Sequence, residues 1–254
     1  MKIQYASDLH LEFAGNASYL KHNPLKVAGD ILILAGDIGY LGDQNYSRHP
    51  FWDWASENYE QVIVAMGNHE FYKFFDISTL DNGHILQIRH NVAAYYNRVI
   101  SIGDTDIIVS TLWSEIPREE AAFTEQVITD FSRIMYGDED LLTFADFNRE
   151  HRKCLDFVKS AVSASNARHK IVVSHHVPSF RMQCPKFKDS NANGAFIVEL
   201  EGYIKESGVD FWIYGHSHYN VDVRIGRTLC ISNQLGYVFN NEHLTFRNDA
   251  FIEV

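Results

Sequence analysis

Five short polar clusters hold the residues of this chain best suited to chemistry, and each cluster lies where an apolar run ends. Their carboxylate, imidazole and amide groups belong to Asp8, His10, Asp37, Asn68, His69, His175, His176, His216 and His218. These oxygen and nitrogen donors, with no thiolate among them, suit Mn, Fe, Zn or a similar divalent ion. Because so many buried polar groups would each need a partner, the pattern favours a metal site over a purely structural origin.

Two ions fit this donor set better than one, because its members outnumber the ligands that a single tetrahedral site with an open position can use. Asp37 follows the second apolar run and could bridge two ions about 3.5–4 Å apart. A glycine precedes Asp37, Asn68 and His216, and would let the backbone turn sharply under the ions. The residues therefore predict a dinuclear centre.

The apolar runs before the clusters are predicted to be buried strands, because they are rich in β-branched or aromatic residues and end abruptly in polar segments. These strands are expected over residues 2–7, 31–35, 61–66, 171–174 and 209–214. In open α/β sheets, ligands bind at the carboxyl ends of the strands, which is where all five clusters lie.

Helices are predicted where apolar residues recur three and four positions apart, over 51–59, 144–163 and 196–204, with Gly208 ending the last. Further strands are expected as a hairpin over 99–102 and 107–112, and over 221–225, 228–232 and 251–254. This alternation indicates an α/β fold with mixed sheets. Residues 113–143 differ from this alternating pattern. They are expected to form a helical insertion or lid, or a solvated surface excursion.

The composition limits the class of protein and of partner. The 254 residues are 46% hydrophobic, which excludes a disordered chain, and they carry a net charge of −11. This acidity argues against long nucleic acid and anionic membranes, although a bound metal could still attract a small phosphate. No run of 18 apolar residues occurs, so no membrane span is expected. The three cysteines are far apart, which fits a reducing, cytoplasmic compartment.

The clusters resemble the signature blocks of the calcineurin-like metallophosphoesterase superfamily, in that superfamily's order. The blocks are Asp8-x-His10, Gly36-Asp37, Gly67-Asn68-His69-Glu70, His175-His176 and Gly215-His216-x-His218. Segments 111–113, 177–179, 193–196 and 233–237 further resemble a bacterial, single-domain branch of it. One departure concerns the second block, which often continues to a final Asp or Gly three residues after the first Asp, where this chain has Tyr40.

The resemblance implies a four-layer α-β-β-α sandwich of two mixed sheets flanked by helices, built as a single domain over residues 1–254. It implies that one ion is held by Asp8, His10, Asp37 and His218, and the other by Asp37, Asn68, His175 and His216. It also implies that His69 is a catalytic residue outside the ligand set, which protonates the leaving oxygen. The implied reaction is hydrolysis of a small soluble phosphomono- or phosphodiester, by direct attack of metal-bound hydroxide.

Several alternatives stay open at this level. The chain could be a catalytically weak metal-binding scaffold of the same fold, and His69 could merely orient a ligand. Glu70 could be purely structural, and His176 could face the cleft or lie behind the ligands. Substrate contacts are sought near the blocks, at Tyr40, Tyr72, Trp113, Arg181 and Asn193, where an aromatic ring could stack on a base and an arginine could hold a phosphate.

Overall fold

Two mixed β-sheets form the centre of the protein in the computed structural model, which describes residues 1–43, 45–137 and 140–254. The first sheet has the strand order β12 (Phe251–Glu253), β1 (Lys2–Ala6), β2 (Ile31–Leu34), β3 (Gln61–Ala65), β5 (Val92–Tyr96) and β4 (His84–Arg89). The second has the order β10 (Val223–Ile225), β11 (Thr228–Ser232), β9 (Phe211–Tyr214), β8 (His169–Ser174), β7 (Thr105–Ser110) and β6 (Arg98–Ile102).

The four inner strands of each sheet run parallel, and the outermost strand on either side is antiparallel to its neighbour. The predicted hairpin is confirmed, since β6 and β7 pair around the turn that separates Ile102 from Thr105. Because parallel strands share one direction, their carboxyl ends meet at one edge of each sheet. This topology brings together clusters that are up to about 200 residues apart in the chain.

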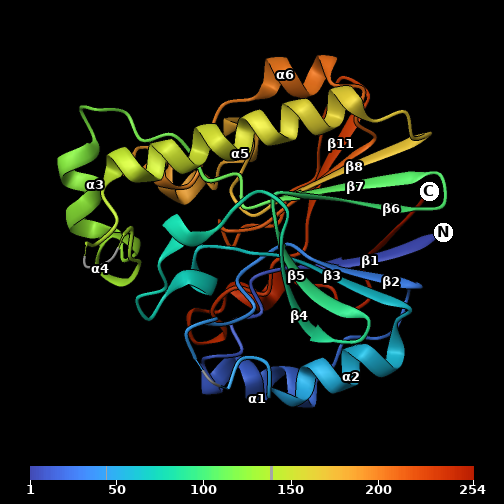
Figure 1. Cartoon of the computed structure of the whole chain (residues 1–254). Coiled ribbons are helices and arrows are strands. Elements are labelled where there is room, and N and C mark those ends of the chain that lie inside the picture. The colour runs from blue at the N-terminus through green and yellow to red at the C-terminus, as the bar shows by residue number, and fades with distance from the viewer. Residues whose placement is uncertain (44, 138–139) are drawn as a thin grey trace.

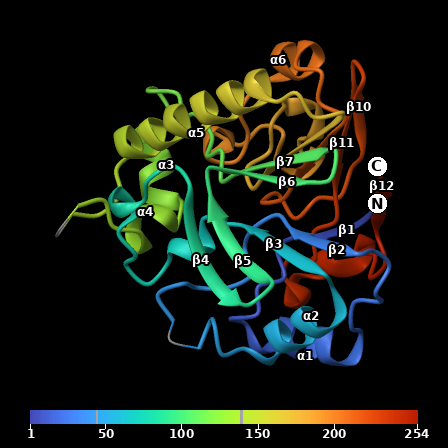
Figure 2. The ribbon, with the colours of Figure 1, turned by 45° about the vertical axis from the view of Figure 1, so that its right-hand side comes forward.

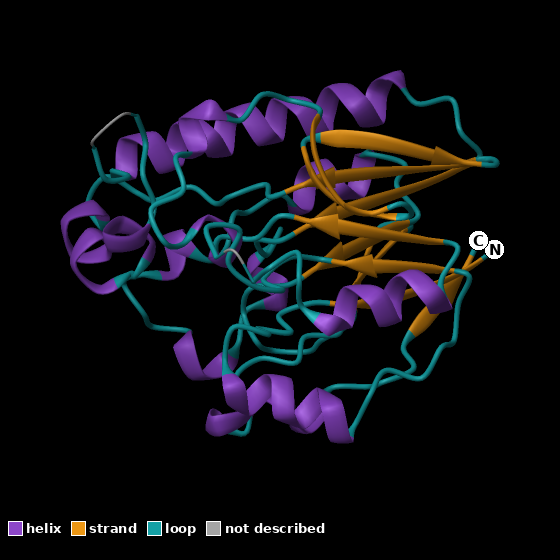
Figure 3. Ribbon diagram, turned by 60° about the horizontal axis from the view of Figure 1, so that its bottom comes forward, coloured by secondary structure: helices purple, strands orange, loops and turns teal. Residues whose placement is uncertain are grey.

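Helices cover the outer face of each sheet, which confirms the expected four-layer sandwich (Figures 1 and 2). Helices α1 (Ala14–His22) and α2 (Pro50–Asn58) lie on the first sheet, and α5 (Phe144–Ala164) and α6 (Glu201–Glu206) on the second (Figure 1). Alternate residues of each strand face opposite ways, so Ile31 and Ile33 pack between the sheets while Leu32 and Leu34 pack toward the helices. The regular secondary structure is seen from a third direction in Figure 3.

Helix α5 matches its prediction because its local sequence and its packing agree. Thr143 and Asp146 form a capping box at its start, each side chain accepting a hydrogen bond from the other's backbone N–H. In its apolar stripe, Val158 is buried against the second sheet, and Phe147 packs on Trp113 and Phe131.

The helix predicted over 196–204 begins only at Glu201, which corrects the expected boundary. Ile197 instead forms a parallel bridge with Val177, and the backbone N–H of Val198 donates to the Val177 carbonyl. Because these backbone groups form hydrogen bonds with another segment, they cannot form the hydrogen bonds of a helix. Helix α1 was not predicted, because it buries only Asn16 and Leu20 and thus lacks a clear apolar period. Strands β4 and β5 were not predicted either.

Two short helices, α3 (Ala121–Val127) and α4 (Asp130–Arg133), lie within the segment predicted to be an insertion, of which residues 138 and 139 fall outside the described part. Figure 1 shows them beyond the sheets, at the end opposite the two termini. Single 3₁₀ turns occur at His69–Phe71, Ile77–Thr79, Phe180–Met182, Pro185–Phe187, Asn193–Ala195, Val238–Asn240 and Glu242–Thr245. Among the described residues, no helix combines the length and apolar character needed to cross a bilayer.

Candidate metal centre

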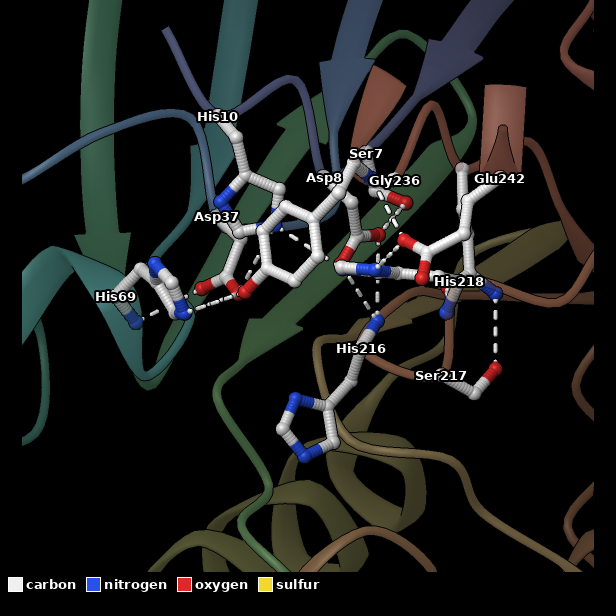
Figure 4. A network of polar contacts seen from close by, with 12 residues as sticks. Ser7, Asp8, His10, Asp37, His69, His216, Ser217, His218, Gly236 and Glu242 are labelled. Atoms are coloured by element: carbon white, nitrogen blue, oxygen red, sulfur yellow. Dashed lines mark hydrogen bonds and ion pairs between the residues drawn. The ribbon is translucent and has the colours of Figure 1, made fainter. Parts of the chain in front are cut away.

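The predicted metal ligands converge at the carboxyl ends of the parallel strands. Asp8 comes two residues after β1, Asp37 three after β2, Asn68 three after β3, His175 directly after β8, and His216 two after β9. All five side chains are buried, as is that of His10. Figure 4 shows Asp8, Asp37, His69 and His218 gathered around one region, although they come from four different loops.

The donor atoms fall into two groups with Asp37 between them. The first donor group comprises Asp8, His10 and His218, whose ligand atoms lie within 4.8 Å of one another. His10 Nε2 and His218 Nε2 are 3.0 Å apart, and His218 Nε2 is 3.4 Å from Asp8 Oδ1.

The second donor group comprises Asn68, His175 and His216. His175 Nε2 lies 3.0 Å from Asn68 Oδ1 and 3.3 Å from Asp37 Oδ1. His216 also offers a ring nitrogen within 4.8 Å of Asp37 and His175. The second oxygen of Asp37 lies 3.8 Å from His10 Nε2, so this carboxylate reaches both groups.

The polar atoms that point away from the centre each have a partner. In the first group, His10 Nδ1 lies 3.0 Å from Glu12 Oε1, and His218 Nδ1 lies 2.6 Å from Glu242 Oε2. Such outer contacts fix the tautomer and orientation of ligand side chains.

In the second group the outer partners are mostly backbone carbonyls. His175 Nδ1 lies 2.8 Å from the Ala35 oxygen, and His216 Nε2 lies 3.2 Å from the Ala195 oxygen. The Asn68 amide donates to a carboxylate oxygen of Asp130 at 2.8 Å, which turns the Asn68 oxygen toward His175. Every outer nitrogen therefore faces an acceptor, and the inner atoms face the centre.

The facing nitrogens of His10 and His218 test whether these residues fit a cation. Both rings direct Nδ1 at a carboxylate, which leaves the two Nε2 atoms facing each other 3.0 Å apart. Only a proton or a metal cation between these nitrogens offsets the repulsion of their lone pairs, and a cation that both nitrogens coordinate does so. Together with the oxygens of Asp8 and Asp37, this donor set fits a divalent metal.

The pKa values of the buried histidine rings depend on the charged groups beside each ring. Although burial alone would lower it, the pKa of His218 is raised to about 10 by its contacts with Asp8 and Glu242. Burial and the neighbouring His175 lower the pKa of His216 to about 3, which keeps this ring neutral. Without a metal, each donor group thus favours one charged ring, because Asp37 and Asp8 raise the pKa of His175 to about 9 despite its burial.

Five residues of the centre have backbone conformations that side chains other than glycine rarely adopt. The φ angle is 55° at Asp8, 47° at His10, 56° at Asp37, 74° at His216 and 50° at His218. Non-glycine residues with positive φ cost of order 1–3 kcal/mol each and concentrate at functional sites, where the surrounding structure holds them. Here each one re-aims a ligand within four residues of the end of a buried strand.

The glycines before the ligands act mainly by leaving room for them. A Cβ at Gly67 would lie 2.3 Å from Asp37 Oδ1, and one at Gly215 would lie 2.7 Å from Asp8 Oδ2. Of the three predicted turn glycines, only Gly36 has a positive φ, of 91°, and a Cβ there would also meet His175. The expectation of a sharp turn at all three is therefore corrected, because two of them serve close approach.

Glu70 fastens two of the ligand loops to each other. Its fully buried carboxylate accepts backbone N–H bonds from Asp37, Ile38 and Gly67 at 2.7–2.8 Å, and a longer one from Gly39. Burial raises the pKa of Glu70, while these N–H donors oppose that shift. Its role is structural, which was one of the two expected readings.

His69 lies beside the centre, and its two ring nitrogens have different surroundings. Its Nδ1 is 2.9 Å from Glu12 Oε1, the same oxygen that contacts His10. Its Nε2 faces Asp37 Oδ2 at 4.0 Å, and its ring stacks on Tyr72 with 4.3 Å between centroids. This Nε2 is thus directed toward Asp37 by a contact on the opposite side of the ring.

Two residues proposed as substrate contacts lie in the interior. Trp113 is fully buried, with its ring against Phe71 and Phe147, so the expectation that it lines the cleft is corrected. His176 is also fully buried, and packs behind His216 with 4.1 Å between ring centroids. Both follow strand ends, but the chain there turns their side chains into the core.

Of the other four candidates, Tyr40 and Tyr72 lie close to the donor groups. The ring of Tyr72 stacks on that of His69, and the half-buried ring of Tyr40 is 5.8 Å from it. Arg181 pairs with Glu201 at the start of α6 and donates to the Arg224 carbonyl on β10. Asn193 donates to the carbonyls of Phe187 and Lys188, and so holds its own loop together.

Four residues of the site were not identified from the sequence, namely Glu12, Asp130, Tyr237 and Glu242. Tyr237 places its hydroxyl 3.3 Å from His69 Nε2, and its ring against His10 and His218. Glu12, two residues after His10, carried a weak signal by its position. Asp130 and Glu242 carried none, because they contact ligands that are distant in the sequence.

Comparison with known proteins places this centre in a family. The sequence pattern of the calcineurin-like phosphoesterases matches residues 1–220. An uncharacterised protein of Acanthamoeba polyphaga mimivirus is 27% identical over an alignment of 277 residues, which covers 99% of this chain and 96% of that protein.

A solved structure shares the fold over the whole chain. It is the phosphopantetheinyl hydrolase of Mycobacterium tuberculosis, with a TM-score of 0.70, 16% identity, and coverage of 100% of this chain and 95% of that one. Since the family pattern spans most of the 254 residues and its blocks form the centre described above, the chain belongs to the calcineurin-like phosphoesterase family and is a metal-dependent phosphoester hydrolase.

Proposed function

We propose that this protein hydrolyses a small phosphomono- or phosphodiester with two divalent ions bound at the strand ends. The observation that carries the proposal is the pair of donor groups joined by Asp37, whose two oxygens face His175 and His10 at 3.3 and 3.8 Å. A single carboxylate shared in this way is typical of two-metal hydrolases.

The proposed ligand sets follow the two donor groups. Asp8, His10, Asp37 and His218 would hold one ion, and Asp37, Asn68, His175 and His216 the other. When bound, such ions neutralise charge on the phosphoryl oxygens and make water a competent nucleophile at neutral pH. Manganese, iron and zinc all suit these donors.

The chain's own contribution to bond cleavage is assigned to His69 and Glu12. The Glu12 carboxylate holds the Nδ1 side of His69, so that Nε2 points at the space beside Asp37. From there, the ring can give a proton to the leaving oxygen, which otherwise departs as an unfavourable alkoxide. Burial opposes a charged ring, but Asp37 and Glu12 raise the pKa of His69 and so favour the proton-bearing form.

Charge and thiol chemistry support a small substrate and a cytoplasmic location. A chain with a net charge of −11 repels long polyanions, whereas two cations at the centre attract a phosphoester at short range. Cys154, Cys184 and Cys230 are all unpaired, as in proteins of reducing compartments.

The test is turnover of a defined panel by Mn-loaded protein. It contains mono- and bis-p-nitrophenyl phosphate, 2′,3′- and 3′,5′-cyclic nucleotides, dinucleotide polyphosphates and sugar phosphates. A phosphopantetheinyl-serine peptide is added because the similar Mycobacterium tuberculosis structure bears the name of a phosphopantetheinyl hydrolase. We expect hydrolysis of at least one small ester with two bound ions per chain. Two bound ions without turnover of any compound would favour a metal-binding scaffold instead.

A further inference from the structure

Tyr237 is a polar aromatic residue whose ring lies against the first donor group. The centroid of its ring is 4.7 Å from that of His10 and 4.5 Å from that of His218. Its hydroxyl lies 3.3 Å from His69 Nε2. The phenol therefore spans from the first donor group to the histidine assigned to the leaving oxygen.

The backbone before Tyr237 is fastened to the same loops that carry the ligands. The N–H of Leu235 donates to the Ser7 carbonyl at 3.1 Å, and that of Gly236 donates to the Asp8 carbonyl at 3.1 Å. Gly236 has a φ of 66°, and a Cβ on it would meet Glu242 at 2.8 Å, so the turn requires glycine. Movement of this segment relative to Asp8 would break these contacts.

Glu242 links the phenol to a metal ligand. One carboxylate oxygen, Oε2, accepts from the backbone N–H of Tyr237 at 2.7 Å and contacts His218 Nδ1 at 2.6 Å. On its outer side, the Tyr237 ring stacks on Phe239, with 5.2 Å between centroids and an interplanar angle of 13°. The position of the hydroxyl is thus set before any substrate arrives, which avoids reorganisation during the reaction.

The hydroxyl and His69 Nε2 meet beside Asp37. His69 is held from behind by Glu12, and its Nε2 is 4.0 Å from Asp37 Oδ2. In the structure, the two polar groups satisfy each other at 3.3 Å, which is a long contact for a hydrogen bond. A phosphoryl group bound beside Asp37 would give each of them an oxygen partner.

We propose that Tyr237 is a catalytic residue whose hydroxyl donates a hydrogen bond to a non-bridging oxygen of the phosphoryl group, while His69 serves the leaving oxygen. A phenol is a far weaker acid than an imidazolium ion, so Tyr237 keeps its proton and no bond to it forms or breaks. The hydrogen bond strengthens as charge on the phosphoryl oxygens shifts in the transition state. This role rests on the proposed phosphoesterase function.

The test compares Tyr237→Phe with wild-type protein, both loaded with Mn. We expect kcat to fall by about 10²-fold with little change in KM, as for the loss of one preorganised donor. The fall should be the same for aryl phosphodiesters with good and poor leaving groups. Binding of vanadate, measured by calorimetry, should weaken as well, while the number of bound ions stays at the wild-type value.

Tyr203→Phe is the matched control, because Tyr203 lies on α6 and its hydroxyl has no hydrogen-bond partner in the described part of the chain. Wild-type kcat and vanadate affinity in Tyr237→Phe would overturn the role of the hydroxyl. A loss that grows with leaving-group pKa would overturn its assignment to a non-bridging oxygen. Failure of the wild-type protein to hydrolyse any phosphoester would instead count against the proposed function itself.

Discussion

Each donor group of the metal centre has two imidazole ligands and one oxygen ligand, but the imidazoles of the two groups are held by different partners. In the first group, the outer nitrogens of His10 and His218 contact the carboxylates of Glu12 and Glu242. In the second group, the outer nitrogens of His175 and His216 contact the backbone carbonyls of Ala35 and Ala195. A carboxylate adds negative charge near an ion, whereas a carbonyl adds only a dipole.

The imidazoles of the first group are therefore held by charged side chains, and those of the second by the path of the backbone. The carboxylates make the rings of the first group more basic, and their effect can be removed by a single substitution that leaves the backbone in place. The carbonyls of the second group belong to the chain path itself, at the end of β2 and in the 3₁₀ turn at Asn193–Ala195. The orientation of the imidazole ligands should thus depend on side chains in the first group and on the chain path in the second.

The largest effect is expected from Asp37→Asn, because this residue serves both groups. Loss of the shared charge should reduce the number of bound ions below two and remove several kcal/mol of transition-state stabilisation, or about 10³-fold in turnover. Metal content by mass spectrometry and kcat on bis-p-nitrophenyl phosphate check this. Asp53→Asn is the control, since Asp53 is exposed on α2 and pairs with Arg89. Two tightly bound ions in Asp37→Asn would contradict a shared ligand.

His69→Asn should affect turnover without changing either donor group. We expect kcat to fall about 10²–10⁴-fold, with the larger loss on esters that have poor leaving groups, while two ions remain bound. A series of aryl phosphodiesters with graded leaving-group pKa measures the trend. Equal losses across the series would show that the ring does not protonate the leaving oxygen, and loss of an ion would make it a ligand.

A matched pair of substitutions, Glu242→Gln and Asp130→Asn, tests whether the two donor groups bind their ions independently. Glu242 contacts His218 of the first group, and Asp130 accepts from Asn68 of the second. Each should weaken one ion by about 10–100-fold and leave the other near its wild-type affinity. Manganese titration against a chelator resolves the two steps. If both variants weaken the same step, the two groups are not independent sites.

The smallest expected effect is a pH dependence of stability in metal-free protein. The pKa of His218 is raised to about 10 by Asp8 and Glu242 despite burial. Its contribution to the free energy of unfolding is therefore full below pH 6.5 and is lost as pH rises toward 10. The pKa of His216 is lowered to about 3 by burial and His175, so its contribution is lost as pH falls from 6.5 toward 3. Urea unfolding after chelation, at pH 5, 7 and 9, measures both directions.

Glu242→Gln sharpens this measurement, because it should flatten the decline in stability between pH 7 and 9 and leave the acid side unchanged. An unaltered slope on the basic side would mean that Glu242 does not hold the charge of His218. Addition of Mn should abolish the basic-side decline in the wild type, since a bound cation replaces the proton on the ring.

The prediction that the polar clusters converge at the strand ends is confirmed, because local sequence carried the information. Asp8, Asp37, Asn68, His175 and His216 each stand at a fixed short distance after a buried strand. Parallel strands must end at a common edge, so the strand pattern alone was enough to bring these side chains together. The sandwich of two mixed sheets, in contrast, was expected from family resemblance.

The prediction failed where the outcome depended on packing between distant segments. Trp113 follows a strand end as the ligands do, yet its ring is buried between Phe71 and Phe147. The segment before α6 is not helical, because its backbone forms hydrogen bonds with that of Val177. Neither outcome has a signature within a short window of residues.

Residue types and spacing by themselves determined which atoms could bind a metal, because donor chemistry and the period of a strand are local properties. Only the tertiary structure decided how those atoms are aimed. Glu12, Asp130 and Glu242 each turn a ligand toward the centre, and Tyr237 is set over it by bonds to Asp8 and Glu242. Asp130 and Tyr237 act across 62 and 168 residues of chain, a distance over which only folding correlates positions.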